Sequence, residues 1–390
     1  MISINNSNRK SDDEIDTRIS GLFFSCLVAL VSFLMITTLI QDSIIKPRLY
    51  DGSINELGRY SMTFDGYLHI EENSQNSVIA IGSSKMREAF DGVQIGNEFG
   101  GSYDFYNLAV AGDRPYVRML EIDAIISANP KYVVLEIGPN SFSFLSTPVP
   151  ESTLSRMGHL SALGNVDLNS YPDSVLNKSD LVMLPSSKYD QEKLIASYSL
   201  EAIEDTIEIE LFDENPPWSC SGRLANVRCV PLPTNSTFDQ YLRYPTQFGN
   251  TLEKIKTGAI TKWTIEEFYG AKLDQYINGS YHNPEGIMNK NQMSFEYIID
   301  ELIKAEIGVI LVGLPYNPVL LDRLHWGQWD YYNESVREYS LRDTISVIDM
   351  MWDDDWEEVH FNDFTHMSRQ GELLFAEKLH GNLSIIMEAN

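Results

Sequence analysis

The chain is poor in cysteine and in basic side chains. Among its 390 residues are 3 Cys, and 29 Lys and Arg stand against 56 Asp and Glu, which gives a formal net charge of -27. This balance argues against nucleic acid as a partner, because binding phosphates needs a clustered positive field. Internal repeats and low-complexity tracts are also lacking, and 43% hydrophobic with 22% charged residues is the composition of a folded globular protein.

One segment near the N-terminus, residues 19–40, contains no charged side chain. A helix of this length, at 1.5 Å per residue, crosses a hydrocarbon layer of about 30 Å. No small-residue cleavage site follows the segment, as one would after a signal peptide. The pattern therefore predicts an uncleaved single-pass transmembrane anchor. Residues 1–18 would form a short cytoplasmic tail, and 41–75 a membrane-proximal linker.

The orientation of the anchor rests on three weak signals. Three basic residues precede the segment and two, Lys46 and Arg48, follow it closely, a small bias. Cys220 and Cys229 lie nine apart in a proline-rich stretch, which suits a disulfide, although two unpaired thiols remain the alternative. Five possible N-glycosylation sites follow the anchor, at Asn177, Asn235, Asn278, Asn333 and Asn382. Together these features favour a glycosylated extracytoplasmic domain at the cell surface, with a cytoplasmic domain as the alternative.

Short apolar runs alternate with helical patterns in two parts of the chain. The runs predict buried strands at 77–81, 104–109, 131–137, 308–314 and 345–349. Helical spacing lies between them at 115–128 and 294–305, and again at 368–379. This order predicts an α/β fold with a parallel sheet, formed by 76–144 and 291–390. Residues 145–290 have few such runs and are interpreted as a helical insertion or lid.

Serine, aspartate and histidine occur where a hydrolytic site would need them. Ser84 follows Gly82 and Ser83 at the end of the first strand, where ligand sites of parallel sheets lie. Serine is a weak nucleophile unless a base takes its proton, and His366, oriented by Asp363 three residues before it, is a candidate base. N-capping of a helix by Ser84 is the structural alternative.

Acyl transfer also needs donors aimed at the developing oxyanion. The backbone N–H groups of Ser84 and Gly112 and the side-chain amide of Asn140 are candidates. No spacing among His282, His325 and His360 indicates a metal pair, so neither a metal nor a cofactor is predicted.

The ordered blocks Gly82-Ser83-Ser84, Gly112, Gly138-Pro139-Asn140 and Asp363-Phe364-Thr365-His366 resemble those of the SGNH/GDSL hydrolase superfamily. The resemblance covers about 75–145 and 295–385. It implies a flavodoxin-like three-layer α/β/α fold, with Ser84 as nucleophile, His366 as base, Asp363 as its orienting acid, and Gly112 and Asn140 as oxyanion donors.

The first block usually reads Gly-Asp-Ser, and this chain has Ser83 in place of the aspartate. Gly-Ser-Ser with a basic residue three positions on, here Arg87, looks like the membrane-anchored branch that includes D-alanine transfer and alginate-acetylation proteins. Such proteins act on cell-surface polymers, often beside a multispan acyltransferase.

The function predicted from these observations is that of a membrane-anchored esterase or O-acyltransferase. It would act on an acylated glycan or another surface polymer through an acyl-enzyme on Ser84. A catalytically inactive surface protein that keeps the fold for binding or assembly is the alternative.

Overall fold

The computed structural model describes residues 23–32, 35, 56–142, 145, 149–164, 166–176, 238–244, 289–321 and 330–388. The chain divides into two compact units, residues 1–48 and 49–390.

In the first unit, residues 23–32 are helical and their apolar side chains are exposed. Across the described ranges, no helix is long and apolar enough to cross a membrane. Much of the predicted anchor at 19–40 lies outside those ranges, so it stays a prediction. Outside them too lie Cys220, Cys229 and three of the predicted glycosylation sites, Asn177, Asn235 and Asn278.

A five-stranded sheet forms the centre of the second unit. The strands are β1 (Ser77–Ile81), β2 (Asp104–Asn107), β3 (Tyr132–Ile137), β4 (Gly308–Gly313) and β5 (Ile345–Asp349). They pair in the order β2-β1-β3-β4-β5, and every pair is parallel. The predicted α/β class and parallel sheet are confirmed, and all five predicted strands are present.

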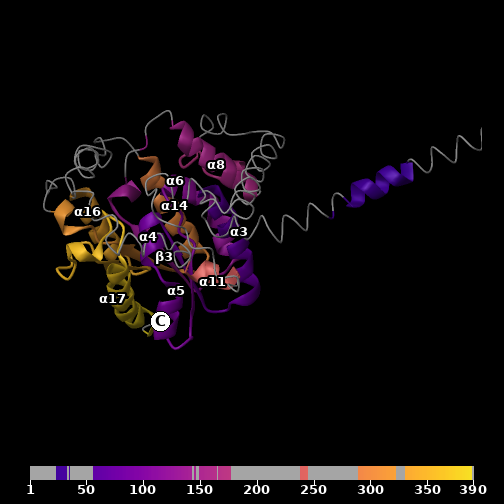
Figure 1. The fold of residues 1–390 in the computed structure, drawn as a ribbon. Helices are drawn as coiled ribbons and strands as arrows, with labels where there is room; N and C mark the ends of the chain where they lie inside the picture. The colour runs from indigo at the N-terminus through magenta and orange to yellow at the C-terminus, as the bar shows by residue number, and fades with distance from the viewer. Residues whose placement is uncertain are drawn as a thin grey trace, which may run out of the picture. The chain divides into compact units, whose positions relative to one another are not determined.

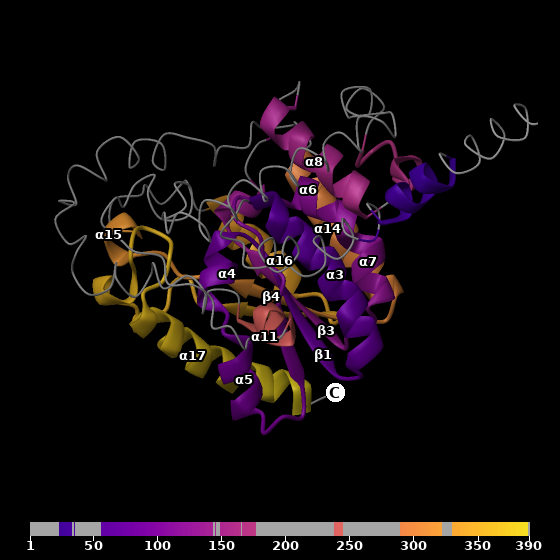
Figure 2. The same ribbon diagram turned by 45° about the vertical axis from the view of Figure 1, so that its right-hand side comes forward.

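Both faces of the sheet are buried beneath helices (Figures 1 and 2). Alternate strand residues therefore enter two different cores: Ile79 and Val133 belong to one, Val78 and Val134 to the other. The first core is completed by α3 (Glu56–Asn73), α6 (Pro115–Arg118), α7 (Ile122–Ser127), α14 (Lys290–Lys304) and α16 (Asp330–Ser340). The second is completed by α4 (Ser84–Ala89), α5 (Gly92–Glu98) and α17 (Arg369–Glu388). Strands covered on both sides explain why the sequence shows continuous apolar runs instead of alternation.

The order of the strands fixes where a site can form. In parallel sheets the loops after the strands meet at one edge, and ligands bind where the strand order reverses. Here the chain passes from β1 outward to β2 and then back to β3 on the other side of β1. The turns that follow β1 and β3 therefore lie side by side at this reversal.

The stretch 41–75 differs from the predicted linker. Helix α3 occupies most of its second half and contributes Tyr60, Tyr67 and Ile70 to the core, each nearly or fully buried. These side chains recur at helical spacing, and α3 packs against α7. The linker prediction is therefore wrong for 56–73, which is an integral helix of the sheet domain.

The described parts of 145–290 pack on the same domain. Helix α8 (Glu151–Leu163) buries Leu154, Met157 and Leu160 in the core shared with α3. After it comes the 3-10 helix η4 (Leu168–Ser170). Helix α11 (Phe238–Arg243) contacts β2 and α3, and its Arg243 pairs with Asp104 at 2.8 Å. These parts cover the sheet domain instead of forming a separate body.

The helix predicted at 115–128 is interrupted. A 3-10 segment, η2 (Met119–Glu121), separates α6 from α7. The side chains of its N-cap residue, Arg118, and of its last residue, Glu121, are buried. The remaining short elements are η3 (Pro139–Phe142), α15 (Pro318–Leu321) and η9 (Glu358–His360). His360 belongs to η9, where its Nδ1 accepts a hydrogen bond from the Glu357 backbone N–H at 2.9 Å.

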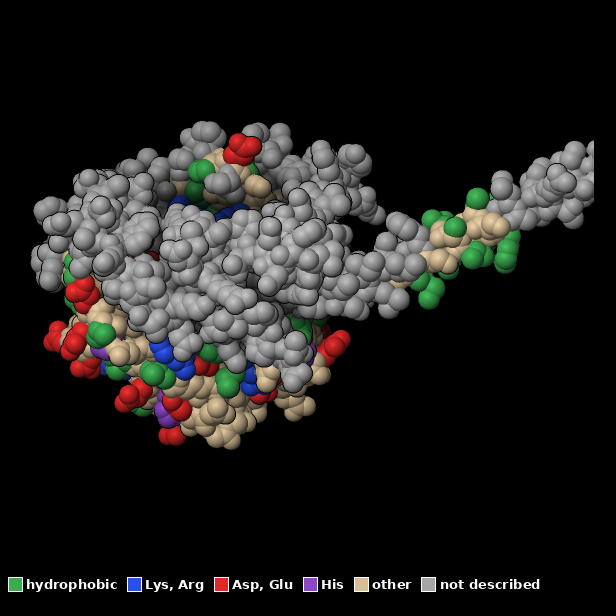
Figure 3. Space-filling view, in the orientation of Figure 1, with side chains coloured by type: hydrophobic (Ala, Val, Ile, Leu, Met, Phe, Trp, Pro, Cys, Tyr) green, Lys and Arg blue, Asp and Glu red, His purple; other side chains and the backbone are tan. Residues whose placement is uncertain are grey.

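Acidic side chains are spread over the described part of the face in Figure 3, with fewer Lys and Arg among them. Two predicted glycosylation sites fall in described helices. Asn333, half-buried in α16, accepts a hydrogen bond from Trp352 Nε1 at 2.9 Å. Asn382, on α17, is exposed. Glycosylation at either remains a prediction.

Candidate active site

Ser84, His366 and Asp363 come together at the edge of the sheet. His366 Nε2 lies 2.8 Å from Ser84 Oγ, and His366 Nδ1 lies 2.7 Å from Asp363 Oδ2. Almost three hundred residues separate Ser84 from the other two. The hydrogen-bonded arrangement expected from the sequence is therefore present, with each ring nitrogen of His366 engaged by one partner.

The segment that carries Asp363 and His366 is braced by its own hydrogen bonds. Asp363 Oδ1 accepts from the backbone N–H groups of Thr365 and His366, both at 2.8 Å, while its Oδ2 faces the imidazole. Asn362 N donates to His366 O at 2.8 Å, and an isolated antiparallel bridge joins Phe361 to Met367. One carboxylate thus shapes the turn and orients the ring, which explains the three-residue spacing.

Ser84 is held at the first turn of α4. Ser83, not Ser84, is the N-cap residue, and its Oγ accepts from Lys85 N at 3.3 Å. The structural alternative for Ser84 is therefore wrong, since capping falls to its neighbour. Capping by Ser83 leaves the Ser84 hydroxyl directed to His366.

The charges around His366 favour its protonated form. Burial lowers the pKa of the imidazole, but the negative charges of Glu88 and Asp363 outweigh it and raise the pKa to about 9. Arg87 acts in the opposite direction. For Asp363, burial raises the pKa of the carboxyl, yet His366 and the backbone N–H donors bring it down to about 2. The two groups therefore form an ion pair near neutral pH.

The predicted oxyanion and binding residues lie in the segments that follow β1, β2 and β3. Gly112 lies in the turn after β2 with φ of +66°, a conformation that strongly favours glycine. The Asn140 backbone lies in η3 after β3, while its side chain falls outside the described residues. Arg87, on α4, pairs with Glu88 at 3.6 Å.

Sequence reasoning missed a buried ion pair beside the turn that carries Ser84. Glu136 Oε1 lies 3.0 Å from Lys85 Nζ, and both side chains are about 95% buried. Glu136 also accepts from the Ser83 backbone N–H at 2.6 Å and from Ser83 Oγ at 3.0 Å. A signal was present, because Glu136 is the single charged residue in an otherwise apolar strand.

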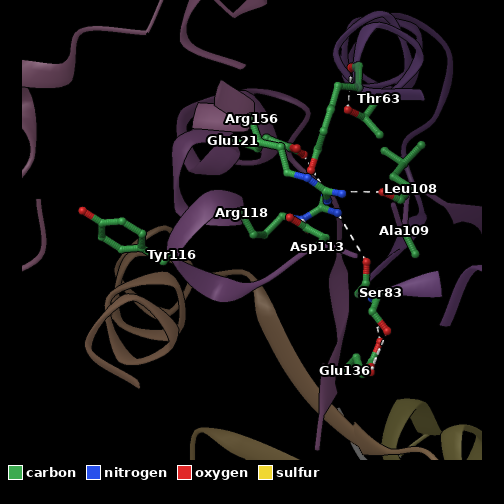
Figure 4. Close-up of polar contacts among 12 residues, drawn as sticks. Thr63, Ser83, Leu108, Ala109, Asp113, Tyr116, Arg118, Glu121, Glu136 and Arg156 are labelled. Carbon is green, nitrogen blue, oxygen red and sulfur yellow. Dashed lines mark hydrogen bonds and ion pairs between the residues drawn. The ribbon is translucent and has the colours of Figure 1, made fainter. Parts of the chain in front are cut away.

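A second buried network lies beside the first, around Arg118 (Figure 4). Its guanidinium pairs with Asp113 and Glu121 and donates to the carbonyl oxygens of Leu108 and Gly82. Burial raises the pKa of both Asp113 and Glu121, and Arg118 opposes that rise. Through these bonds the loop after β2 is tied to the turn that precedes Ser84.

A pocket opens between the two networks. Its polar lining includes Ser83, Asp113, Arg114 and Glu136, and its apolar wall includes Phe295 of α14. The pocket therefore adjoins the turn that carries Ser84 at the point where the strand order reverses.

No protein-family model matches this chain, and no curated protein matches its sequence.

Proposed function

We propose that the protein is a serine esterase or O-acyltransferase that forms an acyl-enzyme on Ser84. The observation that carries this proposal is the contact of Ser84 Oγ with His366 Nε2 at 2.8 Å, backed by Asp363 at 2.7 Å. A hydroxyl, an imidazole and a carboxylate connected in this order are what nucleophilic acyl transfer requires.

In the proposed reaction, neutral His366 takes the Ser84 hydroxyl proton as Oγ attacks the ester carbonyl carbon. The tetrahedral oxyanion is stabilised by the backbone N–H groups of Ser84 and Gly112 and by the Asn140 amide. Collapse breaks the ester C–O bond, and His366 returns the proton to the departing alcohol. Water or an acceptor hydroxyl then attacks the acyl-enzyme with His366 as base, which releases Ser84. Asp363 stabilises the imidazolium formed in each half.

The fold supports assignment to the SGNH/GDSL superfamily. The strand order β2-β1-β3-β4-β5 is that of flavodoxin-like doubly wound sheets. The four sequence blocks follow β1, β2, β3 and β5, at the edge of the sheet where these parallel strands end. Ser83 in place of the usual aspartate favours the membrane-anchored branch, and with it an extracytoplasmic enzyme acting on an acylated surface glycan or polymer beside a multispan acyltransferase.

The alternative, a binding or assembly module without activity, is less well supported. It would leave no reason for His366 to lie within hydrogen-bond distance of both Ser84 and Asp363.

Hydrolysis of p-nitrophenyl acetate by the full-length chain tests the proposal. We expect Ser84→Ala to lose nearly all turnover, because no other group replaces the nucleophile. Equal rates for wild type and Ser84→Ala, after subtraction of the buffer blank, would contradict it.

A further inference from the structure

We propose that the buried pair Glu136–Lys85 is a positioning device that sets the Ser84 hydroxyl against His366. This inference rests on the proposed function, since it concerns how the nucleophile is held. Neither residue contacts the reacting atoms in the proposed mechanism, so both would act through the backbone of the turn that presents Ser84.

Glu136 reaches the nucleophile turn from the neighbouring strand. One carboxylate oxygen accepts from the Ser83 backbone N–H at 2.6 Å and the other from Ser83 Oγ at 3.0 Å. The two contacts hold Ser83, the residue immediately before Ser84, by its backbone N–H and its side chain (Figure 4). Gly82 makes this approach possible, because a Cβ at that position would lie 2.5 Å from Glu136 Oε2.

Lys85 connects the same carboxylate to the opposite side of the site. Its ammonium lies 3.0 Å from Glu136 Oε1 and donates to Tyr316 Oη at 3.0 Å. It also lies against the turn after β3, where a Cβ on Gly138 would be 3.4 Å from Nζ. Lys85 immediately follows Ser84, so the nucleophile has a tethered residue on each side.

The connection continues to the segment that carries the base. Next to Tyr316, Asn317 Nδ2 donates to Asp363 O at 3.2 Å, and Asn317 N donates to Phe364 O at 2.9 Å. The loop after β4 therefore contacts both Lys85 and the Asp363 turn. Contacts through Glu136, Lys85, Tyr316 and Asn317 therefore connect the turn of Ser84 to the turn of Asp363 and His366. In this proposal they determine the distance between Ser84 and His366.

The surroundings of Glu136 favour its carboxylate form. Burial raises the pKa of Glu136, but Lys85 and the bonds from Ser83 outweigh it and hold the pKa below its ordinary value. A carboxylate can accept from Ser83 and Lys85 at once. A glutamine cannot, because its NH2 group would face at least one of these donors.

The test compares four full-length variants: Glu136→Gln, Lys85→Met, the double variant Lys85→Met/Glu136→Gln, and Glu296→Gln as control. Glu296 accepts from Tyr339 and from Arg342, so the control removes another paired carboxylate without touching the Ser84 turn. Each variant is reacted with a fluorophosphonate probe. The limiting rate of labelling and the probe concentration giving half that rate are measured below the unfolding temperature of each protein.

We expect Glu136→Gln to lower the limiting rate about a hundredfold, the scale of a misplacement of about 1 Å, with a nearly unchanged half-saturating concentration. The double variant should recover much of the thermal stability lost in Lys85→Met, because no unpaired buried charge remains. Its labelling should stay slow, because the carboxylate is still missing. Glu296→Gln should label as fast as wild type.

A labelled wild type with an equally fast Glu136→Gln variant would overturn the positioning inference alone. Labelling that recovers together with stability in the double variant would also overturn it, since the pair would then be purely structural. A folded wild type that does not label would overturn the proposed function, and this inference with it.

Discussion

The charge of Glu88 should set the pH at which the site becomes active. Glu88 lies one turn along α4 from Ser84 and is the strongest of the influences that raise the pKa of His366 to about 9. In the proposed mechanism, His366 accepts the Ser84 proton only when its imidazole is neutral. With a pKa of about 9, roughly 1% of His366 is neutral at pH 7, against about three quarters at the ordinary value of 6.5.

Activity should therefore rise about tenfold per pH unit from pH 7 and level off above about 9. Glu88→Gln removes a negative charge, so the midpoint should move to lower pH and the rate at pH 7 should increase. Arg87→Gln is the matched control of opposite sign, because its positive charge lowers the same pKa. Removing it should move the midpoint upward. His366 is 27% exposed, so solvent screening limits both shifts.

The assay is the labelling rate with a fluorophosphonate probe from pH 6 to 10, corrected for spontaneous probe hydrolysis. Opposite displacements of the midpoint in the two variants are expected. If both variants kept the wild-type midpoint, or moved it in the same direction, the electrostatic reasoning would be refuted.

Two other substitutions test the surrounding turns, and a third, in helix α17, is a control. Gly112→Ala should destabilise the protein by about 1–2 kcal/mol in urea unfolding, because φ is +66° and the new Cβ would lie 3.0 Å from Arg156. Gly381→Ala should stabilise the protein instead, because Gly381 lies within α17 and a Cβ there would meet open space. Equal changes in unfolding free energy at the two glycines would contradict the argument from the positive φ of Gly112. Asn317→Ala should cost about 1–3 kcal/mol and lower kcat for p-nitrophenyl acetate, because the Asp363 turn loses a buried tether. If kcat is unchanged in Asn317→Ala, the hydrogen bond from Asn317 to Asp363 does not contribute to catalysis.

The strands were the most predictable part of the fold. Buried parallel strands leave continuous apolar runs, and β1 and β5 begin and end where those runs do. Helix α3 was missed because its few core side chains, two of them tyrosines, are interspersed with polar residues, a pattern that looks like a linker. Its burial comes from packing against α7 and α8, which no local pattern reveals.

The contacts of Ser84, His366 and Asp363 were predictable because the order of the strands brings their loops to one edge. The pairing of Glu136 with Lys85 was not. The single charged residue in an apolar strand indicates that Glu136 has a buried partner, but it does not say which residue that partner is. Their pairing depends on β1 lying next to β3, a neighbourhood that follows from the topology and not from spacing along the chain.

The most direct test of the central claim is covalent labelling of the full-length chain with a fluorophosphonate probe, with the modified residue located by peptide mass spectrometry. The account predicts a single adduct on Ser84 in wild type at pH 9 and no adduct in Ser84→Ala or His366→Ala. A folded wild type without an adduct, or an adduct that persists in Ser84→Ala, would contradict the claim that this serine is an activated nucleophile.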